Sequence, residues 1–294
     1  MYNLMLALIR RRKSDSGLIT DWKWIEGHPE TFGWYHFMWL GIMVLACFLL
    51  SYFLGRKHNS KTDDKVIFGF GIFLLLIETY KQIFSTLEAG HFQWYMFPFQ
   101  FCSVPMYVAV IAPLIKREKV KDAMYKFLAY FGLTAGLAVM VYPESCLYTP
   151  YVTILIHTMA WHCSMVIMGV YLIVAKGYGK NFLNEVMPAA MVYSVFFGMA
   201  FWGNIIMYHA FFNTPLANGE SCNFFYISPY YRSTLPILST IWGIVETSMW
   251  LYPVFVLAYI AAFLIGISTI FGGVRLIVYL SKKPRNKKVQ TLSN

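Results

Sequence analysis

The stretch FPFQFCSVPM, residues 97–106, decides how the rest of the chain is interpreted. It is an apolar run that carries one thiol, Cys102, between Pro98 and Pro105. Pro98 suits the first turn of a helix, where its missing N–H is not needed. Pro105 is expected inside the helix, where it leaves the carbonyl of Phe101 without a donor. A thiol beside loosened backbone is a candidate for chemistry, although most membrane cysteines are small apolar packing groups.

The composition predicts a membrane protein. Of 294 residues, 58% are hydrophobic and only 13% are charged, whereas about 25% are charged in a typical soluble domain. The net charge of +10 is concentrated in short clusters between apolar runs, as in the cytoplasmic loops of polytopic proteins. We therefore expect a membrane-embedded protein that has no nucleic-acid partner.

Seven apolar runs follow one another along the chain. Each approaches or exceeds the length of about 20 residues that a membrane-crossing helix needs. The predicted fold class is all-α, a polytopic membrane protein with a seven-transmembrane-helix bundle as one domain, residues 34–281. A weaker apolar stretch, residues 233–245, is expected to be re-entrant or interfacial. The seven runs are residues 34–54, 66–87, 93–115, 123–141, 151–175, 185–209 and about 246–274.

Basic residues predict the orientation of this bundle. They follow the first, third, fifth and last runs, for example at Arg56 and Lys57, while the sixth connection holds only Arg232. The positive-inside rule places the C-terminus, residues 282–294, in the cytoplasm as a basic tail, and the N-terminus outside. Residues 1–33 are expected to form an amphipathic interfacial or extramembrane segment. The predicted location is the cell membrane, crossed several times.

The five cysteines divide between spans and connections. Cys47, Cys102 and Cys163 fall inside apolar runs, whereas Cys146 and Cys222 fall in the fourth and sixth connections. These connections lie on the same side of the predicted bundle. A disulfide between Cys146 and Cys222 is therefore possible in an oxidising compartment. The alternative is that both are free thiols.

Ionisable residues at membrane depth are functional candidates because they are costly to bury. Glu78 and Lys81 are three residues apart and share one helical face, so they form either a structural ion pair or part of a polar cavity. His157 and His162 lie five residues apart, which is about 140° of helical rotation. That spacing differs from the i, i+4 pair of a zinc helix. We expect no metal site and no cofactor.

Depth in the membrane does not choose between the two histidines as a partner for the thiol. If the third span starts at Gln93, Cys102 lies about 14 Å deep, which matches His162 at about 16 Å. If the span starts at Pro98, the thiol is shallower and His157 is the better match. Both pairings stay open on this argument.

The order of these residues resembles a known family. The shared features are Pro98, Cys102 and Ser103 after Glu78 and Lys81, then His162, Tyr171, Lys176–Gly177, Asn204 and Asn223. This pattern is similar to the YwaF-like integral membrane family, which includes the animal transmembrane protein 164 acyltransferase. The bacterial pattern LPLHLC appears here as FPFQFC, so Gln100 replaces a histidine. The resemblance covers about residues 70–245.

The resemblance implies a seven-helix fold and a function. The catalytic pair that the resemblance implies is Cys102 as nucleophile and His162 as general base. The implied reaction moves a fatty acyl chain between a phospholipid and a lysophospholipid through a thioester on the cysteine. Gln100, Asn204 and Asn223 are the expected oxyanion donors or cavity groups. The competing class is a transporter, channel or lipid-translocating protein. In that class the ionisable residues Glu78, Lys81 and His157 would line a polar path between helices.

Overall fold

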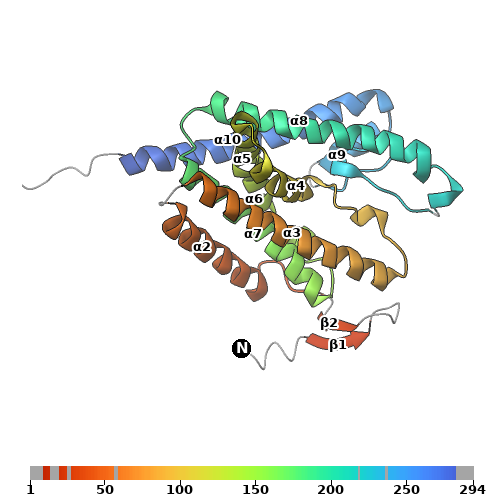
Figure 1. Cartoon of the computed structure of the whole chain (residues 1–294). Helices are drawn as coiled ribbons and strands as arrows, with labels where there is room; N and C mark the ends of the chain where they lie inside the picture. The colour runs from red at the N-terminus through yellow and green to blue at the C-terminus, as the bar shows by residue number, and fades with distance from the viewer. Residues whose placement is uncertain are drawn as a thin grey trace, which may run out of the picture.

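The structure is a computed structural model that describes residues 9–13, 20–24, 28–55, 59–217, 219–235 and 238–282. These residues form a bundle of helices and one small β-hairpin (Figure 1). The expected basic tail lies outside the described residues from position 283 onward, as do Arg56 and Lys57. The orientation that those charges indicate therefore stays a prediction.

Within the described ranges, six helices are long and apolar enough to cross a membrane. This confirms a polytopic helical protein that crosses the membrane several times. The six are α2 (Trp34–Phe53), α3 (Ser60–Ala89), the continuous run α5, η5 and α6 (Glu118–Phe127, Leu128–Gly132 and Leu133–Val141), α7 (Val152–Lys176), α8 with η7 (Phe182–Met207 and Tyr208–Phe212), and η10 with α10 (Met249–Leu251 and Tyr252–Lys282).

The third apolar run is shorter than a full crossing. It forms one helical stretch, Phe101–Leu114, which at about 1.5 Å per residue covers about 21 Å. A short turn, η2 (Trp94–Met96), and irregular backbone precede it. The helical stretch is built from η3 (Phe101–Ser103), α4 (Val104–Ile111) and η4 (Ala112–Leu114).

The two prolines that bracket the thiol act differently from the sequence-based expectation. Pro105 lies in the first turn of α4 instead of inside a helix, and the Phe101 carbonyl accepts the Val104 N–H. Pro98 lies in irregular backbone, where its carbonyl accepts the Tyr107 hydroxyl at 2.8 Å. Proline loses no hydrogen bond in a first turn. Helix α4 therefore starts at Val104, with Pro105 in its first turn, and the Phe101 carbonyl is not left free.

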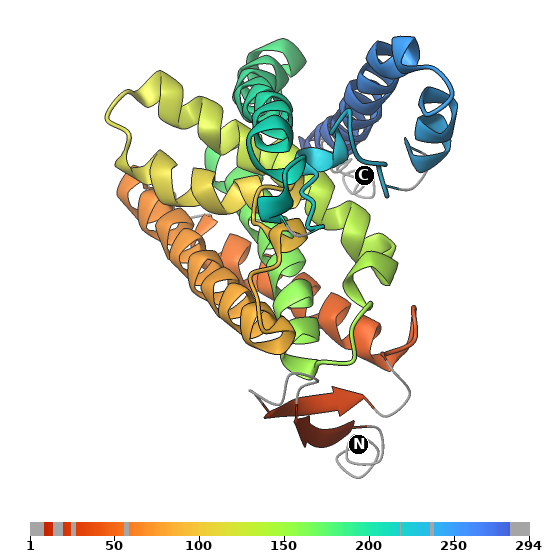
Figure 2. The same ribbon diagram turned by 90° about the vertical axis from the view of Figure 1, so that its right-hand side faces the viewer.

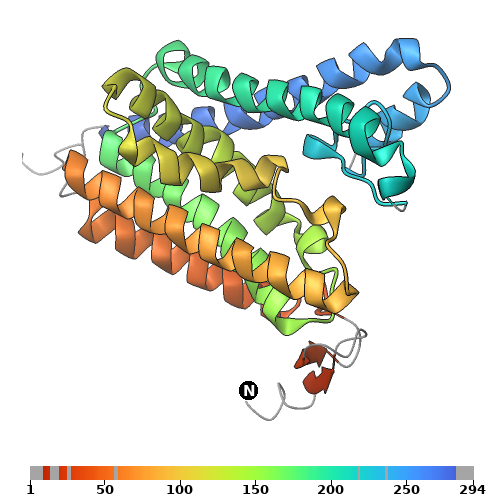
Figure 3. The same ribbon diagram turned by 45° about the vertical axis from the view of Figure 1, so that its right-hand side comes forward.

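Helix α7 forms the centre of the bundle. In its apolar window 78% of the residues are buried, compared with 11% in α2 and 22% in α3. It packs against α2, α3 and α6, and Figure 3 shows α2, α3 and α7 side by side. Gly136 lets α6 approach closely, since a Cβ there would lie 2.9 Å from the His162 carbonyl oxygen. Polar groups on α7 are therefore enclosed by protein rather than by lipid.

Aromatic side chains join the other half of the bundle to the start of α4. The Phe101 ring lies 4.3 Å from Phe263 of α10 and 5.6 Å from Tyr193 of α8, measured between centroids. Tyr193 stacks on Phe131 of η5 at 4.9 Å. Tilted and edge-to-face pairs of this kind add to the stabilisation from burial. The residue next to Cys102 is thus fixed by three other segments.

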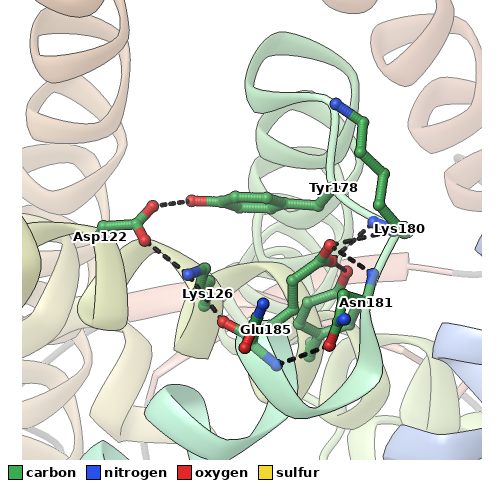
Figure 4. A network of polar contacts seen from close by, with 9 residues as sticks. Asp122, Lys126, Tyr178, Lys180, Asn181 and Glu185 are labelled. Carbon is green, nitrogen blue, oxygen red and sulfur yellow. Dashed lines mark hydrogen bonds and ion pairs between the residues drawn. The ribbon is translucent and has the colours of Figure 1, made fainter.

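A polar network fixes the turn between α7 and α8 at one end of the bundle (Figure 4). The Glu185 carboxylate accepts the backbone N–H groups of Gly179 at 2.6 Å, Lys180 at 2.9 Å and Asn181 at 3.1 Å. It also accepts the Tyr130 hydroxyl from η5. The N–H groups that precede α8 have no acceptor in an earlier turn of helix, and the Glu185 carboxylate satisfies them instead.

The same end of the bundle is tied to α5. Tyr178 donates to Asp122 at 2.7 Å, and Lys126 forms an ion pair with the same carboxylate at 2.6 Å. Gly177 and Gly179 have φ values of 62° and 98°, which glycine adopts readily. The turn therefore has a defined shape, and it sets where α8 begins.

The N-terminal segment contains a hairpin at the opposite end. Strand β1 (Ile9–Lys13) pairs antiparallel with β2 (Thr20–Trp24), with Ile9 opposite Trp24. Lys23 bridges to Tyr151, and its Nζ lies 4.3 Å from the centre of that ring. Figure 2 shows the hairpin beside the start of α7. Helix α9 (Leu238–Val245) occupies the weaker apolar stretch expected at 233–245.

The close approach of α3 and α4 gives a stability prediction. A Cβ at Gly71 would lie 2.7 Å from the Val110 nitrogen, whereas one at Gly69 would meet nothing within 4 Å. We expect Gly71→Ala to destabilise the protein by about 1–3 kcal/mol through overpacking. Gly69→Ala should instead be neutral or stabilise by up to about 1 kcal/mol. Thermal unfolding in detergent compares them, and equal midpoints would contradict this packing.

Candidate functional site

Cys102 lies in η3, directly before α4, and is attached to α7 through its backbone. Its carbonyl oxygen accepts the Trp161 Nε1–H at 2.9 Å. The thiol is therefore placed where a helix start and the central helix meet.

A buried ionic cluster lies next to this contact. Glu78 Oε1 is 2.7 Å from both Lys81 Nζ and Gln82 Nε2, and Glu78 Oε2 is 3.3 Å from His157 Nε2. Glu78 and His157 are only 4% and 7% exposed. Gln82 also donates to the Met96 carbonyl at 2.8 Å. Glu78 and Lys81 thus form a buried ion pair with two further polar neighbours.

His157 and Trp161 of α7 link the ionic cluster to the Cys102 backbone. The His157 ring lies over Trp161, with centroids 5.4 Å apart, and Trp161 is the residue that binds the Cys102 carbonyl. Lys81 is within electrostatic reach of both Cys102 and His162. The side-chain contacts of His162 among the described residues are to Cys146 and the Thr158 carbonyl, so its predicted pairing with Cys102 stays a prediction.

His162 is held in a defined tautomer. Its Nδ1 lies 2.8 Å from the Thr158 carbonyl oxygen, which can only accept, so Nδ1 carries the proton. The neutral ring then keeps its lone pair on Nε2, which is the atom able to take a proton. The ring is 8% exposed. Nε2 is thus the ring nitrogen that keeps its lone pair.

Cys146 contacts this histidine, which the sequence did not indicate. Its Sγ lies 3.3 Å from His162 Nδ1, and its carbonyl accepts the Thr158 hydroxyl at 3.0 Å. His162 stands ten residues past the first residue of α7, about 15 Å along the axis. The short turn η6 (Pro143–Cys146) therefore folds inward after α6 ends, and Cys146 is 2% exposed.

The disulfide considered between Cys146 and Cys222 is not formed in the structure. Cys222 is a free thiol, 3% exposed, in the connection between η7 and α9. Cys146 is turned inward against His162 instead, which is the physical reason that the two do not pair. Burial raises the pKa of the Cys222 thiol to about 12, so at neutral pH it is a poor nucleophile.

Asn204 supports the loop after α8. Its Nδ2 donates to the Phe224 carbonyl at 3.0 Å, and its Oδ1 accepts the Phe224 N–H at 2.8 Å. Phe224 begins η9 (Phe224–Tyr226), in which Phe225 and Tyr226 have φ values of 56° and 57°. Residues other than glycine are rare in this region and persist only where the surroundings hold them.

Asn223 supports the same loop from within. Its Nδ2 lies 3.2 Å and 3.1 Å from the carbonyls of Tyr231 and Arg232, and its Oδ1 accepts the Ser228 N–H at 2.8 Å. Gln100 donates to the Asn223 carbonyl at 2.9 Å. The structure thus uses these three amides to fix η9 against the start of α4.

These features define a class of protein, a polytopic membrane protein with a buried polar site between α3, α4 and α7. Residues 31–270 match the TMEM164 family, and the chain belongs to that family. The family resemblance expected from the sequence is therefore confirmed. No curated protein and no solved structure matches the chain significantly.

The role of Asn204 can be tested directly. We expect Asn204→Leu to leave the backbone N–H and carbonyl of Phe224 unsatisfied, lowering the free energy of unfolding by about 2–4 kcal/mol. Hydrogen exchange at residues 223–228 should become faster. Asn213→Leu, at an exposed position beyond α8, is the matched control. Unchanged exchange in Asn204→Leu would mean that other contacts hold η9.

Proposed function

We propose that this protein is a membrane-embedded acyltransferase of the cell membrane. It moves a fatty acyl chain between a phospholipid and a lysophospholipid through a thioester on Cys102. Family membership supports this proposal, because the acyltransferase resemblance rests on the motif that contains Cys102 and His162. The single observation that carries it is the tautomer of His162, which leaves Nε2 available as a base beside the α4–α7 contact.

The first step forms the acyl-enzyme. The Cys102 sulfur attacks the ester carbonyl of a bound phospholipid while His162 Nε2 takes the thiol proton. The bond between the carbonyl carbon and the glycerol oxygen then breaks. His162 gives its proton to that oxygen, so the products are a thioester on Cys102 and a lysophospholipid.

The second step transfers the acyl chain to the acceptor. The hydroxyl of a different lysophospholipid attacks the thioester carbonyl, and His162 Nε2 takes the hydroxyl proton. The carbon–sulfur bond breaks, and the Cys102 sulfur regains the proton. The protein returns to its starting state, and no cofactor is consumed.

The surroundings of Cys102 suit the negative charge that develops on the carbonyl oxygen. Lys81 acts electrostatically on Cys102 in the direction that favours negative charge, and its ion-pair partner Glu78 acts in the opposite direction. Asn204 and Asn223 are engaged with backbone. We therefore assign oxyanion stabilisation to Lys81. Exclusion of water by the bilayer favours a lipid hydroxyl over hydrolysis.

Cys146 has a positioning role in this scheme. Its sulfur lies beside Nδ1, the protonated nitrogen of His162, which is not the nitrogen that acts as a base. Cys146 contacts the imidazole at Nδ1, next to the Thr158 carbonyl that accepts the Nδ1 proton, and so helps to hold the ring in place. This assignment separates the two cysteines near His162 by role and makes them a matched pair for mutagenesis.

The acyl-enzyme is tested by mass spectrometry of the purified protein in phospholipid vesicles. We expect a fatty acyl adduct that maps to Cys102 and is released by hydroxylamine. Cys102→Ala should abolish both the adduct and acyl transfer. His162→Gln should slow transfer by about 10²–10⁴-fold. Cys163→Ala, a buried cysteine on α7, serves as the control and should keep activity.

Two outcomes would contradict this function. An adduct on Cys146 with full activity in Cys102→Ala would assign the chemistry to the other cysteine. Lipid or ion flux that survives Cys102→Ala and is lost in Glu78→Gln would favour the transporter class instead, because the buried ionic cluster would then line the path.

A further inference from the structure

A buried hydroxyl group near the candidate site has no hydrogen-bond partner among the described residues. It belongs to Tyr259 of α10, whose side chain is 0% exposed. Buried polar groups nearly always have a partner, because a buried donor without an acceptor is unfavourable. The Tyr259 hydroxyl is therefore a candidate for donating a hydrogen bond to a ligand.

Aromatic contacts place Tyr259 beside the segment that carries the thiol. Its ring lies 4.9 Å from Phe263, which is four residues later on α10, and Phe263 lies 4.3 Å from Phe101, measured between centroids. Phe101 directly precedes Cys102. The Tyr259 hydroxyl is also within electrostatic reach of the Cys102 thiol. Helix α10 thus brings a hydrogen-bond donor to the neighbourhood of the cysteine.

A second hydroxyl comes to the same place from η9. Tyr226 is within electrostatic reach of both Cys102 and Tyr259. Its φ value of 57° is one that residues other than glycine rarely adopt. Strained residues of this kind occur mainly at active sites and ligand sites, where their surroundings hold them. Asn204 and Asn223 provide that support, because their amides fix the loop that carries Tyr226.

Neutral donors suit the charge that develops in acyl transfer. The carbonyl oxygen becomes negative when the nucleophile attacks, and hydrogen-bond donors that point at this oxygen lower the barrier. Lys81 contributes positive charge, but its Nζ is 2.7 Å from Glu78, whose charge opposes it. A tyrosine hydroxyl donates a hydrogen bond without introducing a charge, so it is less costly to bury than an ammonium group.

We propose that the Tyr259 and Tyr226 hydroxyls bind the carbonyl oxygen of the acyl ester and stabilise the oxyanion that forms on it, an assignment that rests on the proposed function. As the carbon–sulfur bond to Cys102 forms, the π electrons of the carbonyl move to the oxygen. Both hydroxyls donate to this oxygen and keep their protons. When the bond to the glycerol oxygen breaks, the carbonyl double bond forms again. The same donors serve the thioester carbonyl in the second step.

The rate of acyl-enzyme formation tests this role. We expect Tyr259→Phe to slow the appearance of the Cys102 adduct by about 10²–10³-fold, as removal of one oxyanion donor does in other enzymes, and Tyr226→Phe to slow it at least tenfold. Tyr279→Phe changes an exposed tyrosine of the same helix and should stay within twofold of the parent. Parent-like rates in both Tyr259→Phe and Tyr226→Phe would overturn the proposal.

Thermal unfolding separates this role from a structural one. The Tyr259 hydroxyl has no partner among the described residues, so its removal breaks no hydrogen bond. Tyr259→Phe should therefore unfold at the same temperature as the parent or at a higher one. A lower midpoint together with an unchanged rate would assign this hydroxyl to folding and refute its role at the carbonyl.

A spectroscopic measurement tests carbonyl binding without any chemistry. The Cys102→Ala protein cannot form a thioester, and infrared spectroscopy measures the stretching frequency of an isotope-labelled ester carbonyl in bound phosphatidylcholine. A hydrogen bond lowers this frequency. We expect a lower frequency in Cys102→Ala than in the double variant that also carries Tyr259→Phe. Equal frequencies in the two proteins would contradict carbonyl binding by Tyr259.

The two proposals fail in different ways. If the carbonyl frequency depends on Tyr259 but the parent forms no adduct on Cys102, the hydroxyl site stands and the acyltransferase function is wrong. If the parent forms the adduct, both tyrosine variants form it equally fast and the frequency does not change, the function stands and the hydroxyl site is wrong. The absence of both adduct and frequency change would refute both proposals.

Discussion

The hydrogen bond from Trp161 to the Cys102 carbonyl is the contact on which the site depends. It joins the start of α4 to the central helix α7 at a spacing of 2.9 Å. No water is available to donate a hydrogen bond to a backbone carbonyl in a membrane-embedded segment. A donor from the protein must do so, and it determines where the carbonyl lies. The neighbouring residue on α7 is His162, whose ring is oriented by Thr158. The thiol and the imidazole are therefore positioned by one helix.

The packing of α3 against α7 explains how ionisable groups are tolerated between these two helices. Glu78 is neutralised by Lys81 and contacts His157, while Gln82 completes its hydrogen bonding. These charges satisfy one another inside the bundle, as buried charges must. The outer helices carry the lipid-facing surface, with α2 only 11% buried in its apolar window.

The long helices and the ion pair within one helix could be predicted from the sequence. The apolar run at 34–54 became α2, and that at 151–175 became α7, because span length follows directly from bilayer thickness. Glu78 and Lys81 pair because three residues on a helix share a face. Both results depend on interactions that are local in the chain, so a single sequence was sufficient to find them.

Contacts that depend on tertiary packing could not be predicted from the sequence. The inward turn of Cys146 toward His162 requires α6 to end early beside α7, and only Pro143 after that helix marks it in the sequence. The position of Pro105 at the start of α4, and the engagement of Asn204 with η9, likewise depend on which segments meet in space. Asn204, which was predicted as an oxyanion donor or cavity group, thus holds the η9 loop through Phe224 in the structure.

The proposed function requires the His162 imidazole on α7 to act on the Cys102 thiol in η3, directly before α4. Its most direct test is the rate at which a membrane-permeant haloacetamide alkylates Cys102 in the folded protein, with Cys163 as an internal reference. The account predicts that His162→Gln slows alkylation of Cys102 at least tenfold and leaves Cys163 unchanged, because the base for one thiol has been removed. Equal rates at Cys102 in the parent and in His162→Gln would contradict it.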